Sequence, residues 1–392
     1  MKVVVSGHTF VQRENWARWE RFAELYPDSH VTLLVPSTWR EDRYGVDRVF
    51  VVHPYEKGNF CVLPVDQIEV FGRKFHRSFG LKLKRLQPDI YFITEERYGW
   101  WPYQELLYRR IFCRDAVSVG FTTTNIDYKL AKLRHRIKES MYFREMDAIV
   151  AANRDAYRIL REHGYAKPML VQQENGADER VWCPGRDEEL RKRLRLGDFT
   201  IGYVGTLREE KGVLDLVEAV LGLESDDWTL VFIGDGPERE RILSVLKAGK
   251  RLENARVLGY MERKEIPRYI RELDVLILPS RTTPKWKEQF GLVLAEAMLS
   301  RVAVIGSSSG AIPEVIGNAG LIFEEGNVRQ LSEYLNLLMN NKKMREELAE
   351  KGYRRALARY SATAMSRQIH DFFNQLLKRK GRYANSRNHH AH

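Results

Sequence analysis

Residues 279–298 read PSRTTPKWKEQFGLVLAEAM, and this stretch indicates the fold more clearly than any other part of the chain. It follows the apolar run Val275–Leu278, which has the length and composition of a buried strand. Proline and glycine prevent regular structure until Phe290, after which Leu292–Leu299 can form a helix. A strand, a loop and a helix in this order are the unit of an open parallel sheet, and such sheets bind ligands at the carboxyl ends of their strands. We therefore expect a ligand to lie against this loop.

The same alternation of short apolar runs and amphipathic segments extends along the whole chain. The strand-like runs are Val3–Val5, Val31–Val35, Val49–Val52, Ile90–Ile93, Ala116–Phe121, Ala148–Ala152, Leu170–Val171, Thr200–Val204, Thr229–Ile233, Val257–Leu258, Val275–Leu278, Ala303–Ile305 and Leu321–Phe323. Alternation of this kind predicts parallel sheets covered by helices on both faces. Because so many strands exceed one ordinary sheet, we expect two doubly wound, Rossmann-like α/β domains.

The domain boundary is expected between residues 174 and 185, where turn formers end the first alternating series. This gives domains at 1–180 and 186–362, the second opening with a charged helix at 187–196. Residues 363–380 are expected to form a further helix, because large apolar side chains recur there at helical spacing (Ile369, Phe372, Phe373, Leu376 and Leu377). The polar residues 381–392 are expected to form a disordered tail.

Composition excludes several classes of protein. Hydrophobic residues make up 44% and charged residues 30% of the 392 residues, so the chain is not disordered as a whole. No apolar run is long enough to span a bilayer, and the N-terminus reads as a strand rather than a signal peptide. Three distant cysteines (Cys61, Cys113 and Cys183) form neither a disulfide framework nor a zinc site. We expect a cytoplasmic protein.

The net charge of +11 is concentrated in two parts of the chain. Residues 1–185 hold 29 Lys and Arg against 24 Asp and Glu, and residues 367–392 hold six against one. The excess therefore lies on the first half and the C-terminal segment, which suits an anionic surface or substrate there. A solvated basic face is the alternative reading.

Two carboxylates flank the start of the helix expected at 292–299. Glu288 precedes the helix and Glu296 lies about two turns along it. The free N–H groups of a helix start favour anions, phosphate above all. Two carboxylates at this spacing could reach two hydroxyl-bearing parts of one ligand, although such a pair is more often the solvated face of a helix.

The pair Glu288 and Glu296 matches the E-x7-E motif of family 4 retaining glycosyltransferases, which use nucleotide sugars and have the GT-B fold. Three further segments resemble this family in its order along the chain: IGYVGTLREEKG at 201–212, FIGDGP at 232–237 and SGAIPE at 309–314. Each segment alone is a weak signal. The resemblance covers about residues 199–360, and the chain is identified as a member of this family.

The resemblance implies two Rossmann-like domains facing a cleft, with the C-terminal helix crossing back to the first domain. The first domain would bind the acceptor, and the second a UDP- or GDP-linked sugar. The implied catalytic residues are Glu288, Lys211 and Arg208. The implied donor-binding residues are Gly205, Thr206, Gly234, Gly236, Phe290, Gly291, Leu292, Glu296 and Gly7.

Lys211, Arg208 and the helix start would stabilise the departing diphosphate with cations and N–H groups. The chain shows no Asp-x-Asp cluster suited to a divalent ion beside phosphate. We therefore expect neither a metal nor another cofactor.

The chain departs from the family pattern at two places. Thr206 stands where the family commonly has arginine, so Arg208 is expected to substitute, unless it is a surface arginine. Residues 118–125 lack the histidine that the family often carries near the reacting sugar carbon. The candidates on the acceptor side are His8, Glu96 and Asn125. The alternatives are a surface carboxylate at Glu96 and helix capping by residues 122–125.

The acceptor is expected to be a glycan, a lipid-linked molecule or a small molecule. Residues 71–86 and 128–144 are strongly basic, and aromatic residues gather at 100–103, which favours a peripheral contact with an anionic membrane. Helices that pack their aromatic faces inward would give the same pattern. No compact nucleic-acid-binding motif is present, so no nucleic acid is expected as a partner.

Two other functions remain open at this point. One is a non-catalytic, nucleotide-sugar-binding partner subunit, which the missing histidine makes conceivable. The other is a sugar-phosphate synthase of the same fold. The sequence leaves the base, the sugar, the acceptor and the oligomeric state open.

Overall fold

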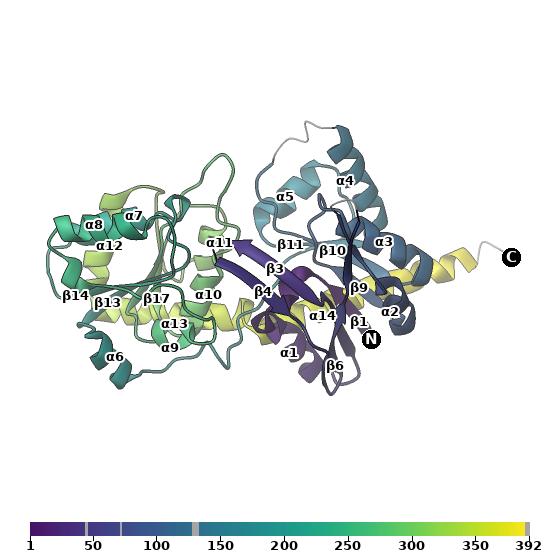
Figure 1. Ribbon diagram of the computed structural model, residues 1–392, viewed down its shortest axis with the longest axis horizontal. Helices are drawn as coiled ribbons and strands as arrows, with labels where there is room; N and C mark the ends of the chain where they lie inside the picture. Colours follow the sequence, from purple (N-terminus) through teal and green to yellow (C-terminus); the bar gives the residue numbers. More distant parts are fainter. Residues whose placement is uncertain (44–45, 71–72, 128–132, 389–392) are drawn as a thin grey trace. The chain divides into compact units, whose positions relative to one another are not determined.

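The computed structural model describes residues 1–43, 46–70, 73–127 and 133–388. The chain forms two compact units (Figure 1). Unit 1 consists of residues 1–176 and 362–392, and unit 2 of residues 177–361. The division at Gly176 falls among the turn-forming residues 174–178.

Unit 1 is built on one sheet in the order β12-β11-β10-β9-β1-β2-β6-β5. Its strands are β1 (Lys2–Ser6), β2 (His30–Pro36), β5 (Tyr55–Lys57), β6 (Phe60–Val65), β9 (Ile90–Ile93), β10 (Val117–Thr122), β11 (Ala148–Ala151) and β12 (Met169–Val171). Neighbouring strands are parallel except β5, which is antiparallel to β6. The order reverses between β1 and β9, and the carboxyl ends of strands at such a reversal are where open sheets bind ligands.

Helices cover both faces of this sheet and leave two hydrophobic clusters, one on each side. The helices are α1 (Ala17–Leu25), α2 (Phe79–Leu86), α3 (Trp101–Phe112), α4 (Leu133–Glu145), α5 (Arg154–Glu162) and α14 (Ala362–Asn388). α14 packs beside α1, although their sequences lie more than 330 residues apart (Figure 1). Its residues Ile369, Phe372, Phe373 and Leu376 join the cluster formed by β1, β2 and α1.

Unit 2 has a parallel sheet in the order β15-β14-β13-β16-β17-β18. Its strands are β13 (Phe199–Val204), β14 (Trp228–Ile233), β15 (Ala255–Val257), β16 (Val275–Leu278), β17 (Ala303–Ser307) and β18 (Leu321–Phe323). Its helices are α6 (Glu188–Leu194), α7 (Val213–Leu221), α8 (Arg239–Ala248), α9 (Ile266–Ile270), α10 (Leu292–Leu299), α11 (Ile312–Ile316), α12 (Val328–Asn340) and α13 (Lys342–Arg359). The order reverses between β13 and β16, directly before the two segments that the sequence analysis singles out.

The prediction of two doubly wound α/β domains is confirmed, and β16 and α10 have the predicted bounds. The prediction that every strand-like run joins a parallel sheet is wrong for residues 49–52. They lie in and next to β4 (Val46–Val51), which forms an antiparallel hairpin with β3 (Thr38–Arg43). A second hairpin joins β7 (Gln67–Val70) to β8 (Arg73–His76). Alternating charged and apolar side chains suit such exposed ribbons, but they do not reveal strand direction.

The predicted disordered tail also needs correction, because α14 continues to Asn388. Gly381 weakens the helix without breaking it, and no proline follows Ala362. Residues 389–392 lie outside the described part of the chain, as do residues 71–72 and 128–132 of the two basic segments. Within the described residues, no helix has both the length and the apolar composition of a membrane span.

Candidate active site

The site in unit 2 lies at the reversal between β13 and β16. The loop after β13 carries Lys211 at the end of a short 3-10 helix, Glu209–Lys211. The loop after β16 carries Glu288 shortly before α10. The topology therefore brings together two segments that are more than 70 residues apart in sequence.

Lys211 and Glu288 form the centre of this site. The Nζ atom of Lys211 lies 2.8 Å from Oε2 of Glu288, and the same carboxylate oxygen accepts a hydrogen bond of 2.9 Å from the Ser280 hydroxyl. The Lys211 ammonium also lies 4.4 Å from the ring centroid of Trp286, a cation–π distance. The side chain of Glu288 is 10% exposed and that of Lys211 is 23% exposed. The pair is thus oriented by its neighbours and still reachable from solvent.

A second set of contacts fixes the two loops against each other. The backbone N–H of Arg281 donates to the carbonyl of Glu210 at 2.8 Å. The guanidinium of Arg281 binds both carboxylate oxygens of Asp215, with an Nε–Oδ2 distance of 2.6 Å. Because bidentate pairs of this kind restrict orientation, they hold the backbone that carries Lys211 against the backbone that carries Glu288.

Glu296, the second carboxylate of the predicted pair, is buried within α10 and contacts Arg263. Burial raises the pKa of Glu296, and the Arg263 guanidinium opposes this shift. Arg263 also lies 5.6 Å from the ring centroid of Trp182. The carboxylate is therefore not on a solvated helix face, which was the alternative interpretation of the glutamate pair.

Three glycines of the site are required by close approaches of the backbone. A Cβ atom on Gly234, whose φ is +139°, would lie 1.9 Å from the carbonyl oxygen of Gly205. A Cβ atom on Gly310 would lie 2.0 Å from the carbonyl oxygen of Glu288. These glycines let the loops after β14 and β17 pack on the loops that carry the predicted donor residues. Gly236 has the same role against Leu207.

The start of α10 has the expected form. Gly291 takes a left-handed conformation, with φ +80°, and as the N-cap residue it has no side chain to cap the helix that begins at Leu292. Phe290 differs from its neighbours, because its ring is buried against Tyr360, with 5.4 Å between centroids. Only the backbone of Phe290 is therefore available to a ligand.

Arg208 and Thr206 each have a partner on their own loop or on the strand before it. Nε of Arg208 lies 2.7 Å from Oε1 of Glu210, and the Arg208 side chain is 40% exposed. The carbonyl of Thr206 accepts a hydrogen bond from the Tyr203 hydroxyl. Arg208 stands on the same loop as Lys211, and its role in binding a diphosphate stays a prediction.

In unit 1, Gly7 and His8 follow β1 at the strand reversal. Nδ1 of His8 lies 2.8 Å from Oε1 of Glu95, and the backbone N–H of His8 donates to the same oxygen at 2.8 Å. The imidazole ring packs on Trp39, with 4.8 Å between centroids, and Trp101 lies 6.3 Å from it. A Cβ atom on Gly7 would lie 2.0 Å from the Thr94 hydroxyl oxygen, which explains the glycine there.

Glu96 and Asn125 are placed differently from His8. Glu96 accepts hydrogen bonds from the hydroxyl groups of Thr122, Thr123 and Thr124 at 2.8–3.1 Å, and from the Thr123 backbone N–H at 2.6 Å. These threonines thus orient the Glu96 carboxylate. The sequence analysis predicted helix capping as the alternative role of residues 122–125 and did not predict this one. Asn125 is buried, with 4% exposure. The carboxylate that contacts His8 belongs to Glu95 and not to the predicted residue, Glu96.

Sequence reasoning did not assign roles to Ser280, Trp286, Arg263, Arg281 or Glu95. Trp286 could have been predicted to belong to the site, because it is a large apolar residue in a polar loop, two residues before Glu288. Arg263 gave no signal, since only the folded chain brings it to Glu296. Among the described residues, no group of three or more His, Cys, Asp or Glu side chains is arranged to hold a metal ion.

Comparison with known families matches residues 186–355 to the family described as glycosyl transferases group 1. The alpha-D-kanosaminyltransferase of Streptomyces kanamyceticus is 28% identical over 196 residues, which is 49% of this chain and 50% of that protein. The capsular polysaccharide biosynthesis glycosyltransferase CapM of Staphylococcus aureus is 25% identical over 194 residues, again 49% of this chain and 50% of that protein. The chain thus spans about half the length of these curated relatives.

Solved structures are similar over nearly the whole chain. HepE from Anabaena, in complex with UDP, has a TM-score of 0.72 and 16% identity, covering 96% of this chain and 100% of that chain. At this identity the likeness shows the fold, which is GT-B with two Rossmann-like domains. Residues 186–355, which contain Lys211, Glu288 and Glu296, are related to the group 1 glycosyl transferases.

Proposed function

We propose that the protein is a retaining glycosyltransferase. It would move a sugar from a UDP- or GDP-linked donor to a glycan, a lipid-linked molecule or a small molecule. The observation that carries the proposal is the Lys211–Glu288 pair at the strand reversal of unit 2, inside the segment related to group 1 glycosyl transferases. The retaining outcome rests on the E-x7-E spacing alone.

The proposed chemistry follows from where charge develops. As the sugar leaves its nucleoside diphosphate, negative charge builds up on the phosphate oxygens. Lys211 would supply a cation to them, and the uncapped N–H groups at the start of α10 would supply hydrogen bonds. Arg208, exposed on the loop of Lys211, would add a second cation. We propose that these groups suffice without a metal ion.

The two glutamates would orient the donor. Glu288 would accept hydrogen bonds from sugar hydroxyl groups, while its contact with Lys211 keeps ammonium and sugar close to each other. Glu296 would accept hydrogen bonds from the ribose, and Arg263 favours the ionised form, in which both carboxylate oxygens are acceptors. The complex of HepE with UDP supports a uridine nucleotide as the first donor to test.

Unit 1 would bind the acceptor at its own strand reversal. His8, fixed by Glu95, lies beside the aromatic rings of Trp39 and Trp101. Aromatic faces with a polar neighbour suit a sugar ring, which presents C–H groups on one side and hydroxyl groups at its edge. The capsular role named for CapM supports an acceptor of the cell envelope.

A peripheral contact with an anionic membrane is part of the proposal. α3 and α4 lie side by side, because Lys138 lies over the ring of Tyr103 and Arg109 lies 3.9 Å from Glu145. Their exposed large apolar side chains are Leu107, Ile111, Ile137 and Met141. Arg110 and Arg144 are exposed on the same two helices. Apolar and basic groups mixed in this way are typical of surfaces that lie on lipid head groups.

The experiment combines donor binding with turnover. Purified protein is titrated with UDP- and GDP-sugars by calorimetry, and turnover is followed as release of the nucleoside diphosphate. NMR of the product then gives the anomeric configuration. We expect turnover with one donor and a product with the donor's configuration. Binding without turnover would favour a partner subunit, a sugar phosphate as the required acceptor would favour a synthase, and inversion would overturn the retaining mechanism.

A further inference from the structure

The basic run Lys378–Lys380 near the end of α14 does not act as one cluster. The Lys380 ammonium donates to the carbonyl of Asp115, and burial lowers its pKa. Lys378 is exposed to solvent. Arg379 lines a cavity of about 520 Å³ between α14 and the segment before and within β12. Arg379 is exposed as well, but of these three cations it is the one that lines this cavity.

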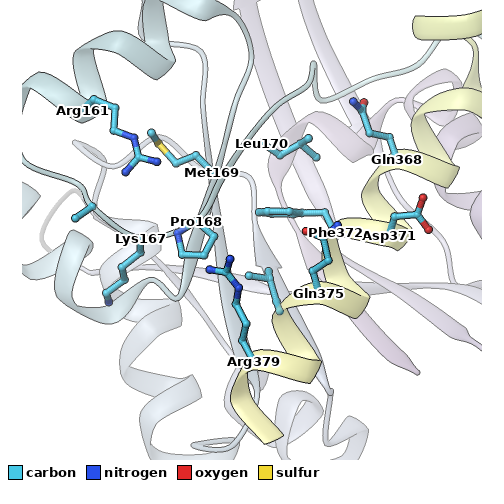
Figure 2. Close-up of a pocket in the computed structure, with 12 residues that line it drawn as sticks. Arg161, Lys167, Pro168, Met169, Leu170, Gln368, Asp371, Phe372, Gln375 and Arg379 are labelled. Atoms are coloured by element: carbon cyan, nitrogen blue, oxygen red, sulfur yellow. The ribbon is translucent and has the colours of Figure 1, made fainter. Parts of the chain in front are cut away.

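Two further cations from unit 1 line the same cavity. Arg161 comes from the end of α5, and Lys167 from the loop before β12. Figure 2 shows Arg161, Lys167 and Arg379 together on one side, with Asp371, the acid in the lining, on the other side. Two parts of the chain that lie more than 200 residues apart in sequence therefore bring positive charge to one place.

Arg161 and Lys167 donate hydrogen bonds to uncharged carbonyl and hydroxyl groups. Nη1 of Arg161 donates to the Tyr165 carbonyl at 2.8 Å, and its guanidinium lies 3.3 Å from the Tyr157 hydroxyl oxygen. The Lys167 ammonium donates to the carbonyls of Arg144 and Met146 at 2.8 and 2.7 Å. Carbonyl and hydroxyl oxygens orient a cation but do not cancel its charge.

Both acidic and basic side chains lie near Lys167. Burial lowers the pKa of Lys167, nearby Asp147 and Glu145 oppose this shift, and Arg109 reinforces it. Asp371 lies 3.6 Å from His370, a contact that is an ion pair only when the histidine is protonated. The lining of the cavity therefore keeps an excess of positive charge, which an anion would relieve.

The remaining wall of the cavity is apolar. Pro168, Met169 and Leu170 come from the segment before and within β12, and Phe372 and Leu376 come from α14. Residues 166–168 precede β12, so the cavity reaches the amino-terminal end of a sheet strand. His8 and Glu95 follow β1 and β9, at the carboxyl ends of strands in the same parallel sheet. The cavity is thus distinct from the proposed acceptor site.

We propose that this cavity binds the phosphate group of an amphiphilic ligand. Arg161 and Arg379 would supply forked N–H donors, a geometry that suits phosphate oxygens, and Lys167 would add a point charge. The apolar wall would receive the first carbons attached to the phosphate ester. The proposal does not depend on sugar transfer, since it uses none of the residues of the donor site.

The test uses soluble probes on the full-length protein, so that no membrane surface is present. Calorimetry measures binding of monomeric dihexanoyl phosphatidylglycerol, of the zwitterionic phosphatidylcholine analogue, and of inorganic phosphate. Arg161→Gln/Arg379→Gln is compared with Arg158→Gln/Lys378→Gln. The control removes the same two charges from the same two helices, but outside the lining of the cavity. Arg379→Gln alone is also measured, because Arg161 anchors the Tyr165 carbonyl and its loss could disturb the fold.

We expect the phosphatidylglycerol analogue to bind more tightly than the phosphatidylcholine analogue. Binding should weaken by roughly tenfold or more in Arg161→Gln/Arg379→Gln and remain in the control. Preference for the lipid over inorganic phosphate would support the contact with the apolar wall, and equal affinity would overturn that contact and leave a site for free phosphate. The proposal is overturned if no probe binds, or if both double variants bind like the unmodified protein.

Discussion

Lys211 and Glu288 are in direct contact, so replacing either should disturb the same interaction with the donor. We expect Glu288→Gln and Lys211→Ala each to lose about 2–4 kcal/mol of transition-state stabilisation, roughly 30- to 1000-fold in kcat/KM. The double variant should lose much less than the sum, because coupled residues are not additive. Steady-state kinetics checks this, with Glu333→Gln on the surface of α12 as the matched control. Unchanged turnover in Glu288→Gln would remove the proposed sugar contact.

Metal ions provide a second test of the same site. Since Lys211, Arg208 and the start of α10 are proposed to stabilise the diphosphate, transfer should continue in excess EDTA. The measurement is the initial rate of transfer before and after chelation, then after addition of magnesium or manganese. A rate that disappears with EDTA and returns with the metal would contradict this mechanism.

Glu105 of α3 gives a prediction about stability rather than activity. Its carboxylate accepts hydrogen bonds from Ser6 at 2.6 Å and Tyr91 at 2.8 Å, and burial raises its pKa to about 8. The folded protein therefore holds a proton that the unfolded chain releases near pH 4.5. The stabilisation from that proton is complete below about pH 4.5 and is lost as the pH rises to about 8.

The measurement is the free energy of unfolding of unit 1, from urea titrations between pH 5 and pH 8. Above pH 5 the loss due to Glu105 approaches about 1.4 kcal/mol per pH unit. Glu105→Gln should lack this part of the pH dependence, because its amide does not titrate. Parallel pH profiles in the two proteins would show that Glu105 is ionised in the fold.

Among the helices, α14 shows how one element stabilises a whole unit. Phe373 is fully buried, with its ring centroid 6.2 Å from that of Phe92 and 6.4 Å from that of Phe22. We expect Phe373→Ala to cost unit 1 about 3–5 kcal/mol, as truncation of a buried aromatic ring usually does. Lys378→Ala, on an exposed position of the same helix, should cost little.

Differential scanning calorimetry checks this prediction if it is run with and without a nucleotide donor. Phe373→Ala should lower the unfolding temperature of unit 1, while a donor should still stabilise unit 2. An unfolding temperature equal to that of Lys378→Ala would show that the apolar stripe of α14 does not contribute to the stability of unit 1.

Elements with strong local signals could be predicted from the sequence, whereas pairing between distant segments could not. β16 and α10 have the predicted bounds, because an apolar run, a loop rich in proline and a glycine mark their ends. The hairpins β3–β4 and β7–β8 could not be predicted as such, since strand direction depends on partners that periodicity does not identify. In the site, Glu288 and Lys211 follow from motifs, but the contacts of Glu296 with Arg263 and of His8 with Glu95 depend on the fold.

Over the whole molecule, the uneven charge leads to a prediction about membranes. The net charge of +11 is concentrated on residues that belong to unit 1, and α3 and α4 expose Leu107, Ile111, Ile137 and Met141 at 45–60%. Basic charge attracts the protein to anionic lipids, and apolar side chains hold it once they enter the interface. We therefore expect the protein to sediment with phosphatidylglycerol vesicles at low salt and much less at high salt. Screening shortens the attraction to about 10 Å at 0.1 M ionic strength.

The variant Leu107→Asp/Ile111→Asp tests which surface is responsible. It removes two exposed apolar groups and adds negative charge, so vesicle binding should fall by roughly tenfold or more. Leu337→Asp is the control, because Leu337 is also an exposed leucine, 40% accessible, but belongs to unit 2. Arg161→Gln/Arg379→Gln should keep most of the vesicle binding if α3 and α4 form the main contact. Equal loss in Leu337→Asp would mean that net charge alone controls binding, and a protein that ignores anionic vesicles at low salt would exclude the membrane contact.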